Sequence, residues 1–128
     1  MSRSAGLIRR SGMDSNHPAW IDISATDAPA SRSFYAELFG WRLRLVEELD
    51  YALVEPGPGT LPGGIGSADE TRPAGITTYF SVADVELTLI RATALGAQVA
   101  TPPWTVPGLG KMAVILDPDG NRVGLWQD

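Results

Sequence analysis

The chain has 128 residues, 44% of them hydrophobic, which is enough for one globular domain with its own core. It has no cysteine, which excludes disulfides and thiolate metal sites, and no apolar run of the length that a membrane span needs. Its formal charge of −5 argues against nucleic acid as a partner, because phosphate binding needs a basic face. Since the N-terminus shows no secretory signal, a cytoplasmic location is expected.

The N-terminal segment differs in charge from the rest of the chain. It contains the basic residues Arg3, Arg9 and Arg10 and no acidic residue before Asp14. We therefore expect residues 1–16 to form a flexible tail and residues 17–128 to form a single domain.

Residues 19–26 alternate between apolar and polar side chains, which predicts a half-buried strand. Asp27 can then cap a helix over residues 30–39, and Gly40 can end it. Four residues of this helix have the spacing of a core face: Phe34, Tyr35, Leu38 and Phe39. Further strands are predicted at residues 41–46, 51–55 and 64–67, with a loop rich in Pro and Gly over residues 56–64.

The same order of elements then repeats. A strand at residues 76–82 precedes Asp84, a second cap candidate, and a helix over residues 85–95 that Gly96 ends. The inward-facing residues of this helix are predicted to be Val85, Leu89, Ala92 and Leu95. The last strands are predicted at residues 98–101, 111–116 and 122–127. Between the last two, Asp117-Pro118-Asp119-Gly120-Asn121 is typical of a hairpin turn.

Two copies of a βαβββ unit therefore follow one another, at residues 17–70 and 75–128, with the cap candidates 57 positions apart. Each unit has one helix for four strands, so a helix can cover only one face of each sheet. The covered faces are predicted to hold Ile21, Ile23 and Ala25 in the first unit and Thr78, Phe80 and Val82 in the second. The opposite faces hold Trp20, Asp22 and Ser24, and Thr77, Tyr79 and Ser81. These more polar and aromatic faces are predicted to line a pocket.

Several motifs also stand in a familiar order. They are Thr26-Asp27 before Ser33-Phe34-Tyr35, then Leu38-Phe39-Gly40-Trp41, Val82-Ala83-Asp84-Val85 and the turn at residues 117–121. Together they resemble the vicinal oxygen chelate superfamily, which includes glyoxalase I, extradiol dioxygenases and bleomycin-resistance proteins. The resemblance implies an α+β fold in which tandem βαβββ modules form a U-shaped sheet around a cleft, with the helices on its outer face. It also implies a homodimer, since dimers are common in the family.

The resemblance places metal ligands on the first, fifth and eighth strands, where this chain has Trp20, Thr77 and Gly124. Tryptophan has no lone pair to give, a lone threonine hydroxyl is a weak ligand, and glycine has no side chain. The fourth strand, where glyoxalase I takes a further ligand, offers only glycine, isoleucine and serine. The chain's one histidine, His17, precedes the first strand and is expected to be exposed. We therefore predict that the protein holds no metal and no cofactor.

If the same strands still line a cleft, aromatic and polar groups share its wall, which suits a flat or partly apolar organic ligand. The predicted ligand-binding residues are Trp20, Asp22, Ser24, Thr77, Tyr79, Met112, Val114, Arg122, Gly124 and Trp126. The alternative is that Trp20 and Trp126 fill a collapsed cleft and that Arg122 is a solvated charge.

Asp22 is the one candidate for catalysis. A carboxylate that faces partly apolar surroundings can act as a general acid or base, or it can be a fixed hydrogen-bond acceptor. The sequence favours metal-independent binding of a small organic molecule, as in the bleomycin-resistance relatives. Two alternatives remain open. One is a glyoxalase-, lyase- or isomerase-type enzyme that uses Asp22 or an atypical metal site, and the other is an interaction module without a ligand.

Overall fold

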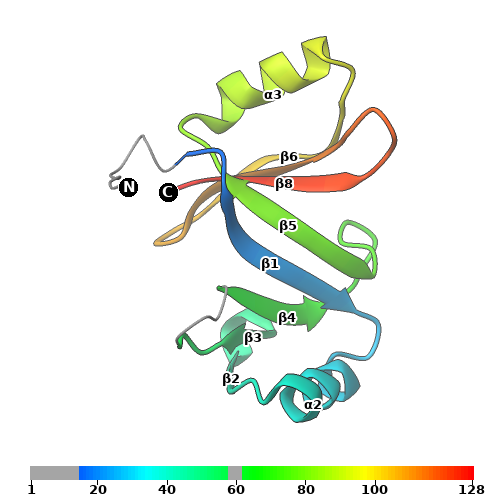
Figure 1. Cartoon of the computed structure of the whole chain (residues 1–128), viewed down its shortest axis with the longest axis vertical. Helices are drawn as coiled ribbons and strands as arrows, with labels where there is room; N and C mark the ends of the chain where they lie inside the picture. Colours follow the sequence, from blue (N-terminus) through cyan, green and yellow to red (C-terminus); the bar gives the residue numbers. More distant parts are fainter. Residues whose placement is uncertain (1–14, 58–61) are drawn as a thin grey trace, which may run out of the picture. The chain divides into compact units, whose positions relative to one another are not determined.

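The structure is a computed structural model that describes residues 15–57 and 62–128. Most of the predicted tail and the centre of the predicted loop at residues 56–64 lie outside this part of the chain. The described residues form two compact units, called here the N-terminal unit (Trp20–Thr78) and the C-terminal unit (Tyr79–Asp128, with the residues before Trp20). Each unit follows the predicted βαβββ order, and the fold class is α+β (Figure 1). Neither described helix has the length and apolar character to cross a membrane.

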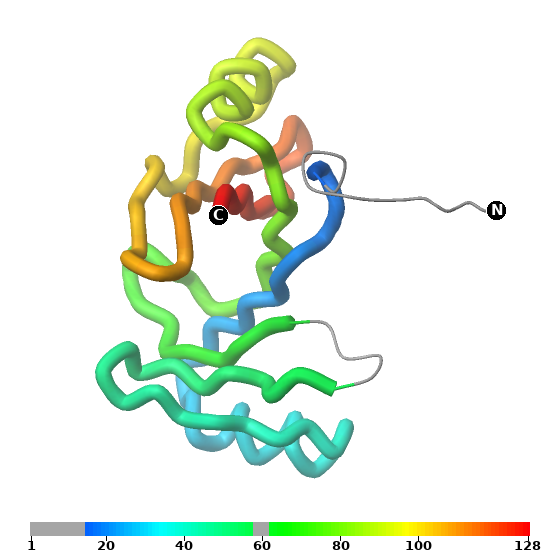
Figure 2. The backbone as a smooth tube through the Cα atoms, turned by 90° about the vertical axis from the view of Figure 1, so that its left-hand side faces the viewer, coloured from blue at the N-terminus to red at the C-terminus, as the bar shows by residue number. Residues whose placement is uncertain are grey.

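The N-terminal unit has one helix and four strands. They are β1 (Pro18–Ala25), α2 (Ala28–Phe39), β2 (Leu43–Val46), β3 (Tyr51–Val54) and β4 (Gly63–Ser67), with a short 3₁₀ helix, η2 (Glu47–Leu49), between β2 and β3. The strand order is β2-β3-β4-β1. β1 and β4 run parallel, with Ile23 opposite Ile65, whereas β3 is antiparallel to both of its neighbours. Figures 1 and 2 both show α2 beside the β2–β3 hairpin.

The C-terminal unit repeats this plan. Its elements are β5 (Gly75–Ser81, which begins in the N-terminal unit), α3 (Val85–Ala94), β6 (Gln98–Val106), β7 (Gly110–Leu116) and β8 (Arg122–Gln127). The strand order is β5-β8-β7-β6, with β5 parallel to β8 and the other pairs antiparallel. β6 is longer than the predicted strand at residues 98–101, because it continues through Pro102 and Pro103 with an irregular register. An edge strand tolerates proline, since its outer hydrogen-bonding groups have no partner strand.

The predicted helix starts and the predicted hairpin turn are confirmed. The Ala30 N–H donates to Asp27 Oδ1 at 3.1 Å, and the Leu87 N–H donates to Asp84 Oδ1 at 3.0 Å. In the turn, the amide side chain of Asn121 donates to Asp117, and this hydrogen bond is the largest of those that lower the pKa of the Asp117 carboxyl. Local side-chain chemistry therefore positions both helices and joins β7 to β8.

The core of the C-terminal unit largely follows the prediction. Val85 and Leu89 are buried, and Ala92 packs against them. The cluster is completed by buried residues from neighbouring elements: Val82, Ala113, Ile115 and Leu125. Leu95 is an exception, with 68% of its surface exposed, because it lies after the last residue of α3.

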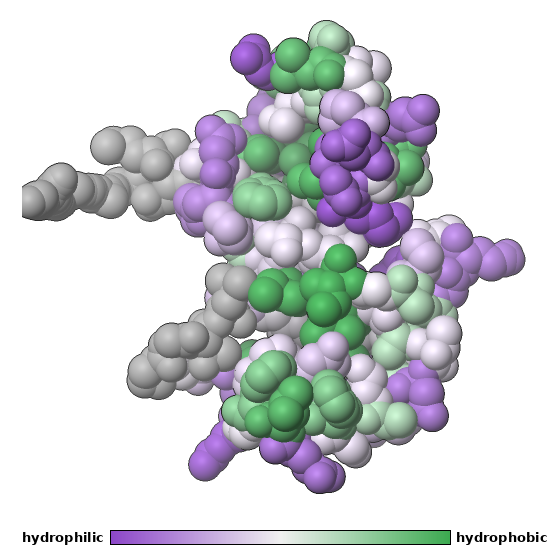
Figure 3. Space-filling view, turned by 45° about the vertical axis from the view of Figure 1, so that its right-hand side comes forward, coloured by the Kyte–Doolittle hydropathy of each residue, from purple (hydrophilic) through white to green (hydrophobic). Residues whose placement is uncertain are grey.

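The predicted burial of the apolar face of α2 is wrong. Phe34, Leu38 and Phe39 were expected in the core, but 57%, 58% and 58% of their surfaces are exposed. Only Ala28 of this helix is buried, and α2 packs mainly against the glycine-rich β4. Helical spacing places residues on one face, but a glycine-rich strand offers few side chains to cover that face. Figure 3 shows hydrophobic surface at the bottom of the view, where α2 lies.

Candidate functional site

The candidate site of the N-terminal unit is a polar cluster around Asp22. As predicted from the alternation, β1 presents Trp20, Asp22 and Ser24 on one face. Two residues that were not predicted join them: Tyr51, the first residue of β3, and Arg72, in the connection between β4 and β5. Asp22 as a whole is 8% exposed, so these partners largely shield it from solvent.

The Asp22 side chain is surrounded by hydrogen-bond donors. The Tyr51 hydroxyl donates to Oδ1 at 2.6 Å, and Arg72 Nη2 donates to Oδ1 at 3.0 Å and to Oδ2 at 3.1 Å. The Ser24 hydroxyl lies 3.4 Å from Oδ2. Charge-assisted bonds of this kind compensate the cost of burying a carboxylate. Both oxygens are thus engaged as acceptors.

Trp20 and Tyr51 extend the cluster. The Trp20 indole N–H donates to the Tyr51 hydroxyl at 3.0 Å, so this hydroxyl accepts one hydrogen bond and donates another. Burial raises the pKa of Tyr51 well above its ordinary value, and the negative charge of Asp22 raises it further. The phenol therefore remains protonated and keeps donating to the carboxylate.

Two glycines of β4 make room for Tyr51. Gly64 and Gly66 lie opposite Asp22 and Ser24 in the parallel register with β1. A Cβ added at Gly64 would lie 2.1 Å from the Tyr51 ring, and one at Gly66 would lie 2.7 Å from it. The ring therefore covers this part of β4. Glycine at alternate positions of a strand was the signal in the sequence that a large neighbouring side chain lies over that face.

Arg72 is held in place by a tight turn. The Asp69 carboxylate accepts from the Arg72 N–H at 2.8 Å and from the Thr71 N–H at 2.8 Å. The hydrogen bond from the Thr71 hydroxyl is the main reason that the pKa of Asp69 is lowered. The guanidinium lies over the Tyr51 ring, with Cζ 5.7 Å from the ring centroid. Arg72 is thus fixed at its backbone by the turn and at its Nη2 by Asp22.

The predicted residues of the C-terminal unit share one face of its sheet. Tyr79 and Val114 both lie opposite Gly124, and Met112 lies opposite Trp126. The Trp126 indole N–H donates to the Leu109 carbonyl at 2.9 Å. Arg122 begins β8 opposite Leu116, and Thr77, which belongs to the N-terminal unit, is buried in β5. Strands β5, β7 and β8 thus bring the predicted residues between Tyr79 and Trp126 together on one face.

Gly124 lies directly under an aromatic ring. A Cβ at this position would lie 2.4 Å from the ring of Tyr79, which is 8% exposed. The position to which the resemblance assigns a ligating glutamate therefore has no room for a side chain unless Tyr79 moves. Glycine here is required by packing.

The donor set does not fit the metal that the resemblance implies. Within residues 15–57 and 62–128, no three His, Cys, Asp or Glu side chains lie close enough together to hold an ion. Asp22, the carboxylate of β1, hydrogen-bonds to Ser24, Tyr51 and Arg72, and none of these is an acidic group or an imidazole. His17 is exposed, as predicted.

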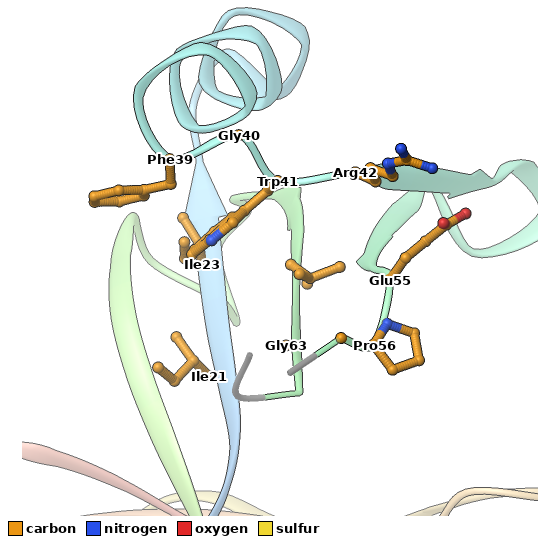
Figure 4. Close-up of a pocket in the computed structure, with 12 residues that line it drawn as sticks. Ile21, Ile23, Phe39, Gly40, Trp41, Arg42, Glu55, Pro56 and Gly63 are labelled. Carbon is orange, nitrogen blue, oxygen red and sulfur yellow. The ribbon is translucent and has the colours of Figure 1, made fainter. Parts of the chain in front are cut away.

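A groove of about 760 Å³ lies on the other face of β1 (Figure 4). Ile21 and Ile23 of β1 line it, and so do Phe39, the last residue of α2, and Trp41, whose ring extends toward Ile23. Sequence reasoning assigned Ile21 and Ile23 to the face covered by the helix and predicted no opening there. The groove exists because α2 leaves this part of the sheet uncovered.

Comparison with known protein families and curated proteins identifies one family and several relatives. The model of the Glyoxalase/Bleomycin resistance protein/Dioxygenase superfamily matches residues 17–125. CFP32 of Mycobacterium bovis, whose name marks it as a proposed glyoxylase, is 33% identical over 94% of this chain and 49% of its own length. The anthracycline biosynthesis protein DnrV of Streptomyces peucetius is 33% identical over 86% of this chain and 46% of its own length. The chain thus spans about half the length of these relatives.

Solved structures share the fold at lower identity. The Mn(II)-bound glyoxalase of Novosphingobium aromaticivorans is 21% identical, with a TM-score of 0.64, and the match covers 90% of this chain and 40% of that chain. The methylmalonyl-CoA epimerase of Mycobacterium tuberculosis is 16% identical, with a TM-score of 0.61, and covers 94% of this chain and 92% of that chain. At these identities the likeness concerns the fold.

Proposed function

Since the chain belongs to the Glyoxalase/Bleomycin resistance protein/Dioxygenase superfamily, we propose that it binds a small, flat, partly apolar organic molecule without a metal ion. The binding groups of the N-terminal unit are Trp20, Asp22 and Ser24, with Tyr51 and Arg72 added. The C-terminal unit has a predicted binding face of its own, with Tyr79, Met112, Val114, Arg122, Gly124 and Trp126, and Thr77 is the predicted residue of β5 in the N-terminal unit.

One observation carries this proposal: the buried carboxylate on the β1 face is already neutralised. Asp22 is paired with Arg72 at 3.0 Å and accepts from Tyr51 at 2.6 Å, so it has no need of a metal ion to compensate its charge. Around it lie two aromatic side chains, and Trp20 is only partly buried. Aromatic surface with a few fixed polar groups suits binding of an organic ring system.

The names of two relatives agree with an aromatic ligand. DnrV and DauV are named for anthracycline biosynthesis, and anthracyclines are planar, fused-ring molecules. This chain matches less than half of each of those proteins, so the agreement supports a ligand class for the matched segment only.

The enzyme alternative receives less support from the geometry. A general base needs a lone pair directed at a substrate, whereas both oxygens of Asp22 accept hydrogen bonds within the protein. Tyr51 remains protonated because its pKa is raised. Asp22 therefore suits the role of a fixed acceptor that positions Tyr51 and Arg72.

The test combines metal analysis with binding measurements. We expect purified protein to contain far less than one metal ion per chain and to bind an anthracycline equally well with and without a chelator. Trp20→Leu should weaken binding about tenfold, because aromatic contacts of this kind contribute roughly 1–1.5 kcal/mol. Isothermal titration calorimetry gives the affinities.

Trp41→Leu is the matched control, since Trp41 lies in the same unit but lines the groove on the opposite face. It should leave the affinity unchanged. Stoichiometric metal, or binding that a chelator abolishes, would contradict metal independence. If Trp41→Leu weakens binding and Trp20→Leu does not, the ligand occupies the groove and the proposed site is wrong.

A further inference from the structure

We propose that Arg72 is an anion-recognition residue, so that the ligand carries a carboxylate or another oxyanion beside its aromatic rings. This inference rests on the proposed function, because it specifies the chemistry of a ligand bound at the β1 face. The guanidinium makes three hydrogen bonds to side chains, two to Asp22 and one to Ser24, and Nη2 donates all of them.

The other nitrogens keep their donors. A guanidinium has five N–H donors, and Nε and Nη1 carry three of them. No acceptor for either atom is found in the part of the chain that the structure describes. Arginine suits recognition of planar oxyanions, because its donors are fixed in one plane. Arg72 can therefore hold Asp22 and a ligand at the same time.

Exposure distinguishes the two members of the ion pair. The Arg72 side chain is 36% exposed, whereas that of Asp22 is 11% exposed. A molecule that approaches from solvent reaches the guanidinium before it reaches the carboxylate. Although the pair is neutral as a whole, the accessible charge is positive, and this favours an anionic ligand over a neutral one.

The position of Arg72 is fixed before a ligand arrives. The Asp69 turn holds its backbone, with the Asp69 N–H donating to the Arg72 carbonyl at 2.9 Å. Asp22 and the Tyr51 ring hold its side chain. Gly66 leaves space beside it, since a Cβ there would lie 3.2 Å from Nη1. A residue held in this way loses little conformational entropy on binding.

The test compares 1-naphthoate with 1-naphthamide, which share their rings and differ in charge. Calorimetry on the full chain should show that wild type binds naphthoate about tenfold more tightly, and that added salt reduces this ratio. Arg72→Gln, which keeps a donor for Asp22 but removes the charge, should bring the ratio close to one, because it should weaken naphthoate binding much more than naphthamide binding. Arg72→Lys should retain part of the preference.

Arg42→Met is the control, because it removes a positive charge from the opposite, groove side of the same unit and should keep the full ratio. A ratio near one in wild type, or an unchanged ratio in Arg72→Gln, overturns the role of Arg72 while the proposed function stands. If wild type binds neither compound nor an anthracycline, the proposed function itself fails. The wild-type ratio and its salt dependence need no variant, so the test holds even if Arg72→Gln does not fold.

Discussion

Tyr51 links residues of the N-terminal unit that lie far apart in the sequence. Its hydroxyl accepts from Trp20 and donates to Asp22, and its ring lies over Gly64 and Gly66. Removal of the hydroxyl takes one hydrogen bond from the charged and buried Asp22, whose Oδ1 keeps the one from Arg72, and it leaves the Trp20 indole N–H without this acceptor. Losses of this kind typically cost about 1.5–3 kcal/mol.

The pH dependence of stability tests this role. The pKa of Tyr51 is raised in the folded protein above the ordinary value of 10.0, so the folded state holds its proton more strongly than the unfolded state does. The stabilisation is fully present below about pH 10 and is lost as the pH rises further. We expect Tyr51→Phe to lower the free energy of unfolding by about 2 kcal/mol at neutral pH, and this deficit to shrink above about pH 10.

Urea denaturation on both sides of about pH 10 measures the difference, in which the titration of other groups largely cancels. Tyr35→Phe is the control, since the Tyr35 ring stacks against Phe39 and Trp41 and has no part in the Asp22 cluster. A deficit for Tyr51→Phe that stays constant across this range would show that Tyr51 and Asp22 are not coupled in solution.

At the scale of the strands, β5 and β8 are fitted to each other through Tyr79 and Gly124. We expect Gly124→Ala to lower the free energy of unfolding by about 1–3 kcal/mol, because the added methyl group would overlap a buried ring. Urea denaturation of Gly124→Ala, Tyr79→Leu and the double variant forms a thermodynamic cycle. The double variant should be more stable than the sum of the single effects predicts, because the smaller side chain makes room. Strict additivity would contradict the close packing.

The elements also show what a sequence can predict. The caps at Asp27 and Asp84 were predictable because their partners lie three residues away. The Asp22 cluster was not, because Tyr51 and Arg72 lie 29 and 50 positions from Asp22 along the chain. Alternation shows which face of β1 a side chain occupies, but it does not show which distant residue covers that face.

The two helices illustrate the same limit. Both have an apolar face in the sequence, yet α3 packs against β6, β7 and β8, whereas α2 packs mainly against β4. The periodicity correctly predicted that Val85 and Leu89 are buried. For Phe34, Leu38 and Phe39 it predicted burial that the strands of the N-terminal unit do not provide. Whether an apolar helix face is covered depends on the partner surface, which the helix sequence does not contain.

For the molecule as a whole, this uncovered face is a candidate contact surface. Phe34, Leu38 and Phe39 each expose more than half of their surface, and Phe34 and Phe39 join an aromatic cluster with Tyr35 and Trp41. Contiguous exposed apolar surface of this kind marks interaction sites. Since the family resemblance implies dimers, we propose that a second copy of the chain covers the α2 face.

Sedimentation velocity over the micromolar range should therefore detect a dimer of wild type. The double variant Phe34→Ser with Leu38→Ser should weaken the dimer by about 2 kcal/mol, roughly thirtyfold in the dissociation constant, because two partly exposed apolar side chains no longer gain from burial.

Leu87 and Ile90 provide the matched control, since they lie on α3 in the C-terminal unit and are 64% and 67% exposed. Replacing both with serine should leave the dimer intact. A monomeric wild type, or a dimer that the α3 substitutions weaken and the α2 substitutions do not, would contradict the assignment, because the aromatic cluster lies on the α2 side and contains Phe34 and Phe39.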